Sequence, residues 1–330
     1  DFEMEEKETP DLLAVIVPSN DTLKPSQSLK QESIQKIANG KWYGKANKLN
    51  EEYFQWEIID IVSDACEEKK SDSDSEKPSP LLFSDTHPVP VNDVKQERKN
   101  TLLAGQIIRQ RRSAVAMDGV TSITKAQFYE MLSRVVPIVG TMMWDSIAQR
   151  PFIHLGLFVH RVVGLIPGLY ALVRDPEKQS LLQTSMHAEF QWKTPLECPQ
   201  SLPLFLLEEK EVQNLAASVS CGQDIAGAGA FSCGMLAEFE EPIRRFGAHW
   251  YRRLFWETGM IGQVLYLEAE AKGVQATGIG CFFDNPVHDV FGLTGHTFQS
   301  LYHFTIGGSV EDDRLSTLPS YQHLASSSIL

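Results

Sequence analysis

A long apolar helix followed by a glycine stop and a short strand constrains this chain most. The stretch 250–272 is apolar on most of its faces, and Gly273 stands just past its end, where glycine is favoured. A helix of this kind belongs in a protein interior or in a subunit interface. The strand expected next, 276–282, carries Gly278 and Gly280, and glycines at a strand end let another group approach the backbone. The segment therefore predicts a central helix beside a strand that can meet a flat or anionic ligand.

Length and charge limit the class of protein. The 330 residues suffice for one large domain or two small ones, and the 42% hydrophobic content is typical of a globular protein. The net charge of −13 argues against a general nucleic-acid binder, because such a protein presents a basic surface. A membrane span needs about 20 mostly apolar residues, and the most apolar run, 151–173, is interrupted by His154, His160, Arg161 and Pro167. We therefore expect neither a nucleic-acid partner nor a membrane partner.

The cysteines and histidines show no metal-site spacing. The cysteines are odd in number and scattered, which indicates neither a disulfide framework nor a zinc site; they are Cys66, Cys198, Cys221, Cys233 and Cys281. This usage favours a reducing compartment, so we expect the cytoplasm, with an organelle as the alternative. Cys281 is expected to be a small apolar filler, with a nucleophile as the alternative. The histidines are expected to be packed or at the surface, and no catalytic residue is assigned; they include His154, His160, His249 and His303.

Composition divides the chain into four stretches. These are an N-terminal segment (1–66), a disordered acidic linker rich in Pro and Ser (67–100), a compact domain (101–315) and a flexible tail (316–330). Within the first stretch, a three-residue repeat of apolar side chains predicts a short amphipathic helix; it consists of Tyr53, Trp56, Ile59 and Val62.

The compact domain mixes helices and strands. Helices are expected over 104–112, 125–135 with Thr124 as N-cap, 240–246, 250–272 and 286–291. Strands are expected over 155–163, 169–173, 202–207, 276–282 and 299–307, and 221–234 is a strand or a loop. The turn 164–168 makes a hairpin of the first two strands. Connections of this type, rather than regular βαβ units, predict an α+β fold with a mixed or antiparallel sheet flanked by helices.

Three short motifs could carry chemistry. Arg111-Arg112-Ser113, the basic motif, offers guanidinium and hydroxyl donors for a phosphate, although a solvated helix end explains the same residues. Thr277-Gly278-Ile279-Gly280, the glycine motif, offers exposed backbone amides, or else a tight turn. Gly259 and Gly262 predict close packing of the central helix, either across a subunit interface or within one subunit.

In this order, the motifs resemble the nitroreductase-like family of FMN-dependent oxidoreductases. Within the family, the chain is most similar to the branch of thiazole/oxazole-forming dehydrogenases. The resemblance covers roughly 104–310. Besides the basic and glycine motifs, it rests on the helix stretch 258–269 (TGMIGQVLYLEA), the hairpin 161–170 (RVVGLIPGLY) and Cys221-Gly222-Gln223.

The resemblance implies a nitroreductase-like fold whose long central helix, 250–272, forms a homodimer interface, with FMN bound there. It implies that the basic motif holds the FMN phosphate and ribityl oxygens, and that Gly278, Ile279 and Gly280 meet the flavin ring. Gln149 would supply a flavin-contacting amide, and Arg314 a C-terminal basic residue. Val115 stands where a basic residue is expected, and 145–149 lacks the expected proline and glycines. Some relatives carry two such halves in one chain, and 1–66 resembles the remnant of a preceding half.

The expected function is therefore hydride transfer through flavin N5. The reaction is either NAD(P)H-dependent reduction of a nitro or quinone acceptor, or dehydrogenation of an azoline-like small-molecule or modified-peptide substrate. The alternative is a degenerate, non-catalytic partner protein that has lost the cofactor. No metal is expected.

Overall fold

The computed structural model describes residues 31–41, 56–67, 103–138, 144, 147 and 149–322. The chain divides into two compact units, 1–62 and 63–330. Helix α1 (Gln31–Ala38) lies in the first unit, and α2 (Glu57–Ala65) runs across the boundary. The expected N-terminal amphipathic helix corresponds to α2, which begins just after Trp56, whereas Tyr53 falls outside the described residues. The four-part division of the chain stays a prediction, because almost all of 67–100 is also outside them.

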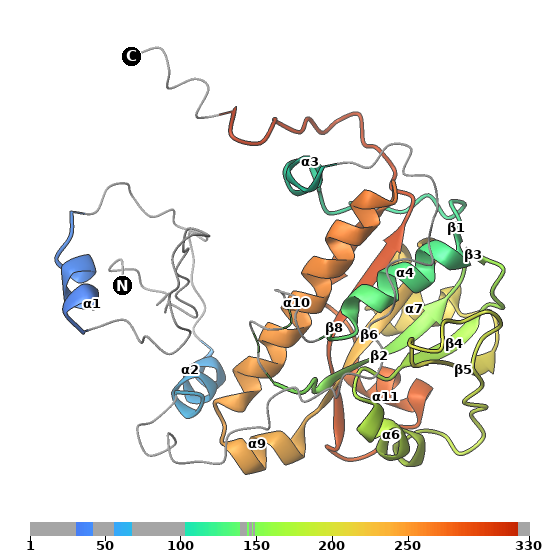
Figure 1. Cartoon of the computed structure of the whole chain (residues 1–330), viewed down its shortest axis with the longest axis horizontal. Helices are drawn as coiled ribbons and strands as arrows, with labels where there is room; N and C mark the ends of the chain where they lie inside the picture. Colours follow the sequence, from blue (N-terminus) through green and yellow to red (C-terminus); the bar gives the residue numbers. More distant parts are fainter. Residues whose placement is uncertain are drawn as a thin grey trace. The chain divides into compact units, whose positions relative to one another are not determined.

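A six-stranded antiparallel sheet forms the centre of the second unit (Figure 1). Its strand order is β5-β4-β2-β6-β8-β7, and every neighbouring pair is antiparallel. The strands are β2 (Ile153–Val159), β4 (Gly168–Leu172), β5 (Leu204–Glu209), β6 (Phe231–Glu238), β7 (Gln275–Ile279) and β8 (Phe298–Gly307). The α+β class and the helix-flanked antiparallel sheet are confirmed.

The predicted hairpin is present, but its first strand is shorter than expected. Strands β2 and β4 pair with Leu157 opposite Tyr170, and β2 ends at Val159 instead of continuing to 163. The amides of His160 and Arg161 both donate to the Ala230 carbonyl, at 3.0 and 2.8 Å. This double contact turns the chain out of the sheet. The next residues form β3 (Val162–Val163), which pairs in parallel with β1 (Ile123–Thr124).

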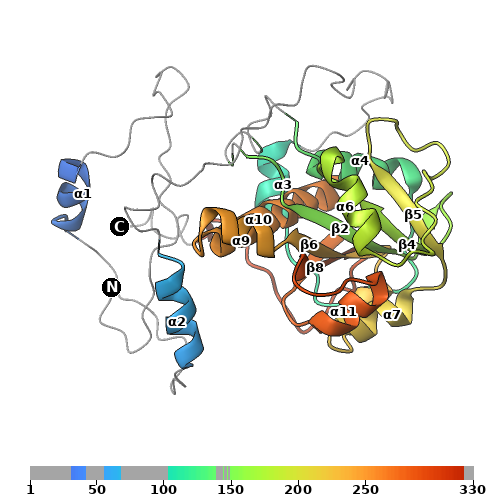
Figure 2. The same ribbon diagram turned by 90° about the horizontal axis from the view of Figure 1, so that it is seen from below.

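Helices cover both faces of the sheet. Figure 2 shows α4 (Lys125–Val135) and α10 (Trp250–Ala271) on one side, and α7 (Gln213–Val219) and α11 (Asp284–Phe291) on the other. Side chains alternate between the two layers, as the strand period of two requires. In β6, Cys233 and Met235 pack in the core beneath α4 and α10, whereas Leu236 packs beneath α7 and α11.

The central helix matches its prediction closely. It spans Trp250–Ala271, and Gly273 takes the positive φ of +72° that a C-terminal glycine provides. A Cβ on Gly262 would lie 3.5 Å from the Phe304 ring, so this glycine packs within the subunit. A Cβ on Gly259 would meet nothing within 4 Å, so this glycine faces outward. Gly262 therefore allows close packing inside the subunit, whereas Gly259 lies on the outward side of the helix.

The sequence signals account for only some of the remaining helices, since none was predicted over 179–185 or 213–219. Thr124 caps α4: its hydroxyl accepts the Gln127 amide at 3.2 Å, and the Gln127 side chain accepts the Thr124 amide at 2.9 Å. The stretch left open as strand or loop contains α8 (Asp224–Ala228) and the start of β6. The shorter helices are α3 (Ala104–Gln110), the 3₁₀ helix η2 (Pro176–Lys178), α6 (Gln179–Ser185) and α9 (Glu240–Phe246). None of the described helices combines the length and apolar content that a membrane span requires.

Candidate functional site

The basic motif and the glycine motif lie side by side at one edge of the sheet. Ser113 forms a parallel β-bridge with Ala276 of β7, and the amide of Ala114 donates to the Ala276 carbonyl at 2.9 Å. Strand β7 is an edge strand, and Gly278 lies two residues beyond this bridge. The fold therefore brings together two of the predicted ligand-binding motifs.

Tyr266 of α10 joins these motifs through one hydroxyl group. Its oxygen lies 2.9 Å from the Ser113 hydroxyl and accepts the Gly278 amide proton at 2.9 Å. The guanidinium carbon of Arg111 lies 4.6 Å from the centre of the Tyr266 ring, which is within cation–π range. The Tyr266 ring also packs against Phe304 of β8 in a T-shaped arrangement, with ring centres 4.8 Å apart. Tyr266 thus ties the helix, the basic motif and the glycine motif into one unit.

The two glycines of the motif have different surroundings. A Cβ on Gly278 would collide with the Tyr302 hydroxyl, so close packing requires glycine there. At Gly280 the nearest atom to such a Cβ is 4.0 Å away, so the backbone can be approached closely from outside. Between them, the Ile279 side chain is buried beneath α7 and α11. Of the three predicted contact residues, Gly280 is the most open.

The two arginines of the basic motif are half-buried, and the described residues give neither of them a carboxylate partner. Arg112 donates from Nη1 to the carbonyls of Arg109 and Arg111, at 3.0 and 2.8 Å, and from Nη2 to Leu318 at 3.3 Å. The Ser113 residue is exposed. These two guanidinium groups and the accessible hydroxyl form a donor set that suits a phosphate.

The structure does not join Arg314 and Gln149 to this cluster by any contact among the described residues. Arg314 is exposed and forms an ion pair with Asp312, with Nη2 of the arginine 2.7 Å from Oδ2 of the aspartate. The hydrogen bond from the Arg314 side chain lowers the pKa of the Asp312 carboxyl. Gln149 is buried, and its Nε2 has no hydrogen-bond partner among the described residues. An unpaired buried amide is unusual in a folded protein and suits a bound ligand. Val115 is exposed, and its side chain has no hydrogen-bond donor.

One expectation about the cysteines is wrong. Cys221 and Cys281 form a disulfide with their Cα atoms 5.9 Å apart, so Cys281 is neither an apolar filler nor a free nucleophile. The partners are 60 residues apart in sequence. The fold brings them together because the Phe283 amide donates to the Val219 carbonyl at 2.8 Å, which holds the end of β7 beside the end of α7. Cysteine spacing alone could not reveal this pair.

A buried histidine lies beside the disulfide segment. The ring of His303 stacks on Phe282 with centres 4.4 Å apart, and its Nε2 lies 3.1 Å from the Ser300 hydroxyl. Burial lowers the pKa of His303 to about 4, so the ring is neutral at pH 7. His154, His160 and His303 are all buried, which confirms that they are packed residues. No group of three His, Cys, Asp or Glu side chains that could hold a metal occurs in the described part of the chain.

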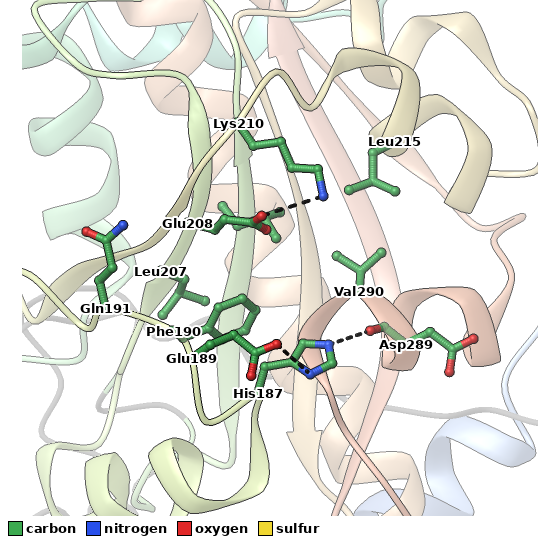
Figure 3. Close-up of a pocket in the computed structure, with 11 residues that line it drawn as sticks. His187, Glu189, Phe190, Gln191, Leu207, Glu208, Lys210, Leu215, Asp289 and Val290 are labelled. Carbon is green, nitrogen blue, oxygen red and sulfur yellow. Dashed lines mark hydrogen bonds and ion pairs between the residues drawn. The ribbon is translucent and has the colours of Figure 1, made fainter.

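A cavity of about 330 Å³ lies elsewhere (Figure 3). It is lined by β4, β5, α7, α11 and the segment 187–191, and β5 is at the opposite edge of the sheet from β7. Two of its ion-pair distances are 3.7 Å, between Lys210 and Glu208, and 3.9 Å, between His187 and Glu189. No residue of the basic motif or of the glycine motif lines this cavity, so it is not the site that the motifs predict.

Comparison with known proteins finds similarity among solved structures only. No protein-family model and no curated protein matches the chain. A protein of Anabaena variabilis described as a nitroreductase has 20% identity and a TM-score of 0.47; the match covers 63% of this chain and 38% of that one. The Escherichia coli microcin synthetase McbBCD, in complex with truncated pro-MccB17, has 16% identity, coverage of 79% and 96%, and a TM-score of 0.44.

A third similar structure is the NADPH:FMN oxidoreductase of Vibrio harveyi complexed with NAD⁺. It has 13% identity, coverage of 68% and 85%, and a TM-score of 0.35. The chain thus spans little more than a third of the Anabaena protein and most of the other two. The resemblance to nitroreductases that the motifs indicate is found again among solved structures.

The residues at the sheet edge fit FMN at the end that would carry its phosphate. Arg111, Arg112 and Ser113 offer the positive charge and the hydroxyl that a phosphate needs, and Gly280 leaves open space beside the backbone. Gln149, in contrast, is not joined to this edge by any contact among the described residues. The amide of Gly278 already donates to Tyr266, so that contact would have to be exchanged or shared.

Proposed function

We propose that the chain is an FMN-dependent oxidoreductase that transfers hydride through flavin N5. The observation that carries the proposal is the meeting of Arg111, Ser113 and Gly278 around the Tyr266 side chain. These positions correspond to those that hold FMN in the family that the sequence resembles. Arg111 and Ser113 are distant in sequence from Gly278, so the convergence of the two motifs does not follow from the motifs themselves.

When bound, FMN supplies the hydride chemistry that protein side chains lack. The guanidinium groups of Arg111 and Arg112 and the hydroxyl of Ser113 would hold the phosphate through charge-assisted hydrogen bonds. The backbone at Gly278, Ile279 and Gly280, with the Gln149 amide, would orient the ring. Tyr266 fixes the glycine motif against α10 and so keeps these donors in place before binding, which favours affinity. Arg314 would contribute only after leaving Asp312.

Two reactions are consistent with such a site. One is reduction of a nitro or quinone acceptor with NAD(P)H as the electron donor. The other is dehydrogenation of an azoline-like ring in a small molecule or a modified peptide. Oxidation of NAD(P)H that depends on the acceptor would select the first. Oxidation of an azoline substrate without NAD(P)H would select the second.

We further propose a homodimer through α10. On the outward side of this helix, Phe255 and Trp256 expose 36% and 37% of their surface, and a Cβ on Gly259 would meet nothing within 4 Å among the described residues. A helix face that combines aromatic side chains with a small residue suits close contact with an equivalent helix.

A second candidate function is that of a non-catalytic partner protein. The hydrogen bond from the Gly278 amide to Tyr266 favours it, because a donor expected to meet the flavin is already satisfied within the chain. The pairing of Arg314 with Asp312 also favours a non-catalytic partner, because this arginine is already engaged within the chain. Val115 favours it too, because an exposed valine stands where a basic residue is expected. Such a protein would keep the fold and the α10 surface without binding FMN.

The deciding experiment is to add excess FMN to the purified chain, remove free flavin by desalting and record the visible spectrum. Retained flavin bands are expected. The double variant Arg111→Ala/Ser113→Ala should bind FMN with at least tenfold lower affinity, since charge-assisted hydrogen bonds contribute about 1.5–3 kcal/mol each. Arg109→Ala, which removes an exposed arginine of α3, is the matched control and should retain FMN like the unmodified chain. A folded, colourless protein would exclude the flavoenzyme and favour the non-catalytic partner.

A further inference from the structure

The disulfide Cys221–Cys281 connects two segments next to the candidate site. Cys281 follows the glycine motif at the end of β7, and Cys221 lies in the turn between α7 and α8. Cys221 and Gly222 both have positive φ, +57° and +70°. The pair therefore links a tight turn to the strand that carries Gly278 and Gly280.

The two cysteines differ in accessibility. Residue Cys281 is exposed, whereas Cys221 is half-buried. An external thiolate can therefore reach the Cys281 sulfur, and exposed disulfides are the ones that exchange readily. A disulfide with a purely structural role does not need an exposed cysteine.

The segments do not depend on the disulfide alone. The Gln223 side chain donates from Nε2 to the Cys281 carbonyl at 3.0 Å and to the Ser220 carbonyl at 2.9 Å. The Phe283 amide donates to the Val219 carbonyl at 2.8 Å. These hydrogen bonds would keep the two sulfur atoms near each other after reduction, which allows the disulfide to form again.

The three other cysteines are poorly suited to thiol–disulfide exchange. Cys66 and Cys233 are buried, and Cys198 is half-buried. Burial raises the pKa of Cys198 and of Cys233 to about 12, so both remain thiols at neutral pH. Exchange should therefore be confined to the Cys221–Cys281 pair.

We propose that Cys221–Cys281 is a redox-active disulfide that exchanges with a low-molecular-weight thiol while the protein stays folded. A thiolate attacks the Cys281 sulfur, a mixed disulfide forms, and Cys221 leaves as a thiolate and takes up a proton. A second thiolate attacks the external sulfur of the mixed disulfide, and Cys281 leaves in the same way. Two thiols are oxidised to one disulfide, and the protein pair gains two electrons and two protons.

Reduction has a local structural consequence. Without the sulfur–sulfur bond, the end of β7 is held to the α7–α8 turn by hydrogen bonds alone. Amide hydrogen exchange should rise at 280–283 and 221–223, and remain unchanged in the paired strands β2 and β6. The proposal does not depend on FMN binding.

The test uses reduced glutathione on the folded full chain, followed by acid quenching, alkylation and peptide mass spectrometry. Cys221 and Cys281 should both become alkylated, while the circular dichroism spectrum stays native. Cys198→Ser should give the same result, because Cys198 takes no part. With oxidised glutathione, Cys221→Ser should form a single mixed disulfide at Cys281.

Three outcomes would overturn the proposal. The first is alkylation of both cysteines only after unfolding, which would make the bond a buried structural crosslink. The second is alkylation without any added reductant, which would mean that the bond does not form. The third is loss of the native spectrum on reduction, which would make the bond necessary for folding.

Discussion

The Tyr266 hydroxyl accepts the amide proton of Gly278 at 2.9 Å, although the two residues belong to different elements, α10 and β7. The same oxygen lies 2.9 Å from the Ser113 hydroxyl. One phenol group therefore fixes the helix, the glycine motif and the basic motif relative to one another. The geometry of the candidate site depends on this side chain, which is not itself part of either motif.

Tyr266→Phe should destabilise the protein by about 1 kcal/mol, because a half-buried amide and a hydroxyl lose their partner. Ser113→Ala should cost less, since it removes only one of the two hydrogen bonds. The double variant should be no less stable than Tyr266→Phe alone, because both changes remove the same contact. Urea unfolding measures all three. If the stability loss of the double variant equalled the sum of the two single losses, the two residues would not share a hydrogen bond through the Tyr266 hydroxyl.

Gly278→Ala should destabilise the protein by about 1–3 kcal/mol, since the added methyl group would collide with the Tyr302 hydroxyl. Gly280→Ala is the matched control, because its methyl group would have no neighbour closer than 4.0 Å. Thermal unfolding of both variants tests the contrast. Equal losses in the two variants would contradict the close contact assigned between Gly278 and Tyr302.

The sequence predicted much of the fold because several signals were strong and local. The apolar stretch 250–272, the glycine after it and the Thr124 cap each act over a few residues, and the structure confirms them. The strand expected over 155–163 was too long, because its end is set by a distant carbonyl, that of Ala230. Local propensity carries no information about such a partner.

The candidate site was predictable only in part, for the same physical reason. The basic and glycine motifs are visible as residue types, and the structure brings them together. Tyr266 could have been suspected, since it lies one helical turn after Gly262 and both face Phe304. The disulfide could not, because its two cysteines are adjacent only after β7 and α7 have packed.

A buried ion pair predicts a large loss of stability on neutralisation. Arg174 is fully buried, forms an ion pair with Glu257 and donates to the Ile153 carbonyl at 2.9 Å. Glu257→Gln would leave the buried guanidinium without its counter-charge, and the expected cost is about 3–5 kcal/mol. The control Glu241→Gln breaks an exposed pair with Arg245 and should cost less than about 1 kcal/mol. Comparable stability losses in the two variants would contradict the burial of the Arg174–Glu257 pair.

Stability should also fall with acid, through His303. Burial lowers its folded-state pKa to about 4, whereas an unfolded histidine titrates near 6.5. Between these values the unfolded state binds more protons, so stability is complete above about pH 6.5 and is lost as the pH falls toward 4. The full shift corresponds to roughly 3 kcal/mol. His303→Gln should weaken the dependence over this range, measured by urea unfolding at each pH, but should not abolish it, because burial also lowers the pKa of His160 to about 4.

The outward face of α10 predicts how the chain associates. A side chain at Gly259 would meet nothing within 4 Å inside the subunit, so Gly259→Trp should leave the monomer folded. In a homodimer through α10, the same indole would hold the two helices apart. The variant should therefore sediment as a monomer while the unmodified chain sediments as a dimer. Gly259→Ala adds one methyl group and should remain largely dimeric. A monomeric unmodified chain, or a Gly259→Trp variant that stays dimeric, would show that α10 does not form the interface.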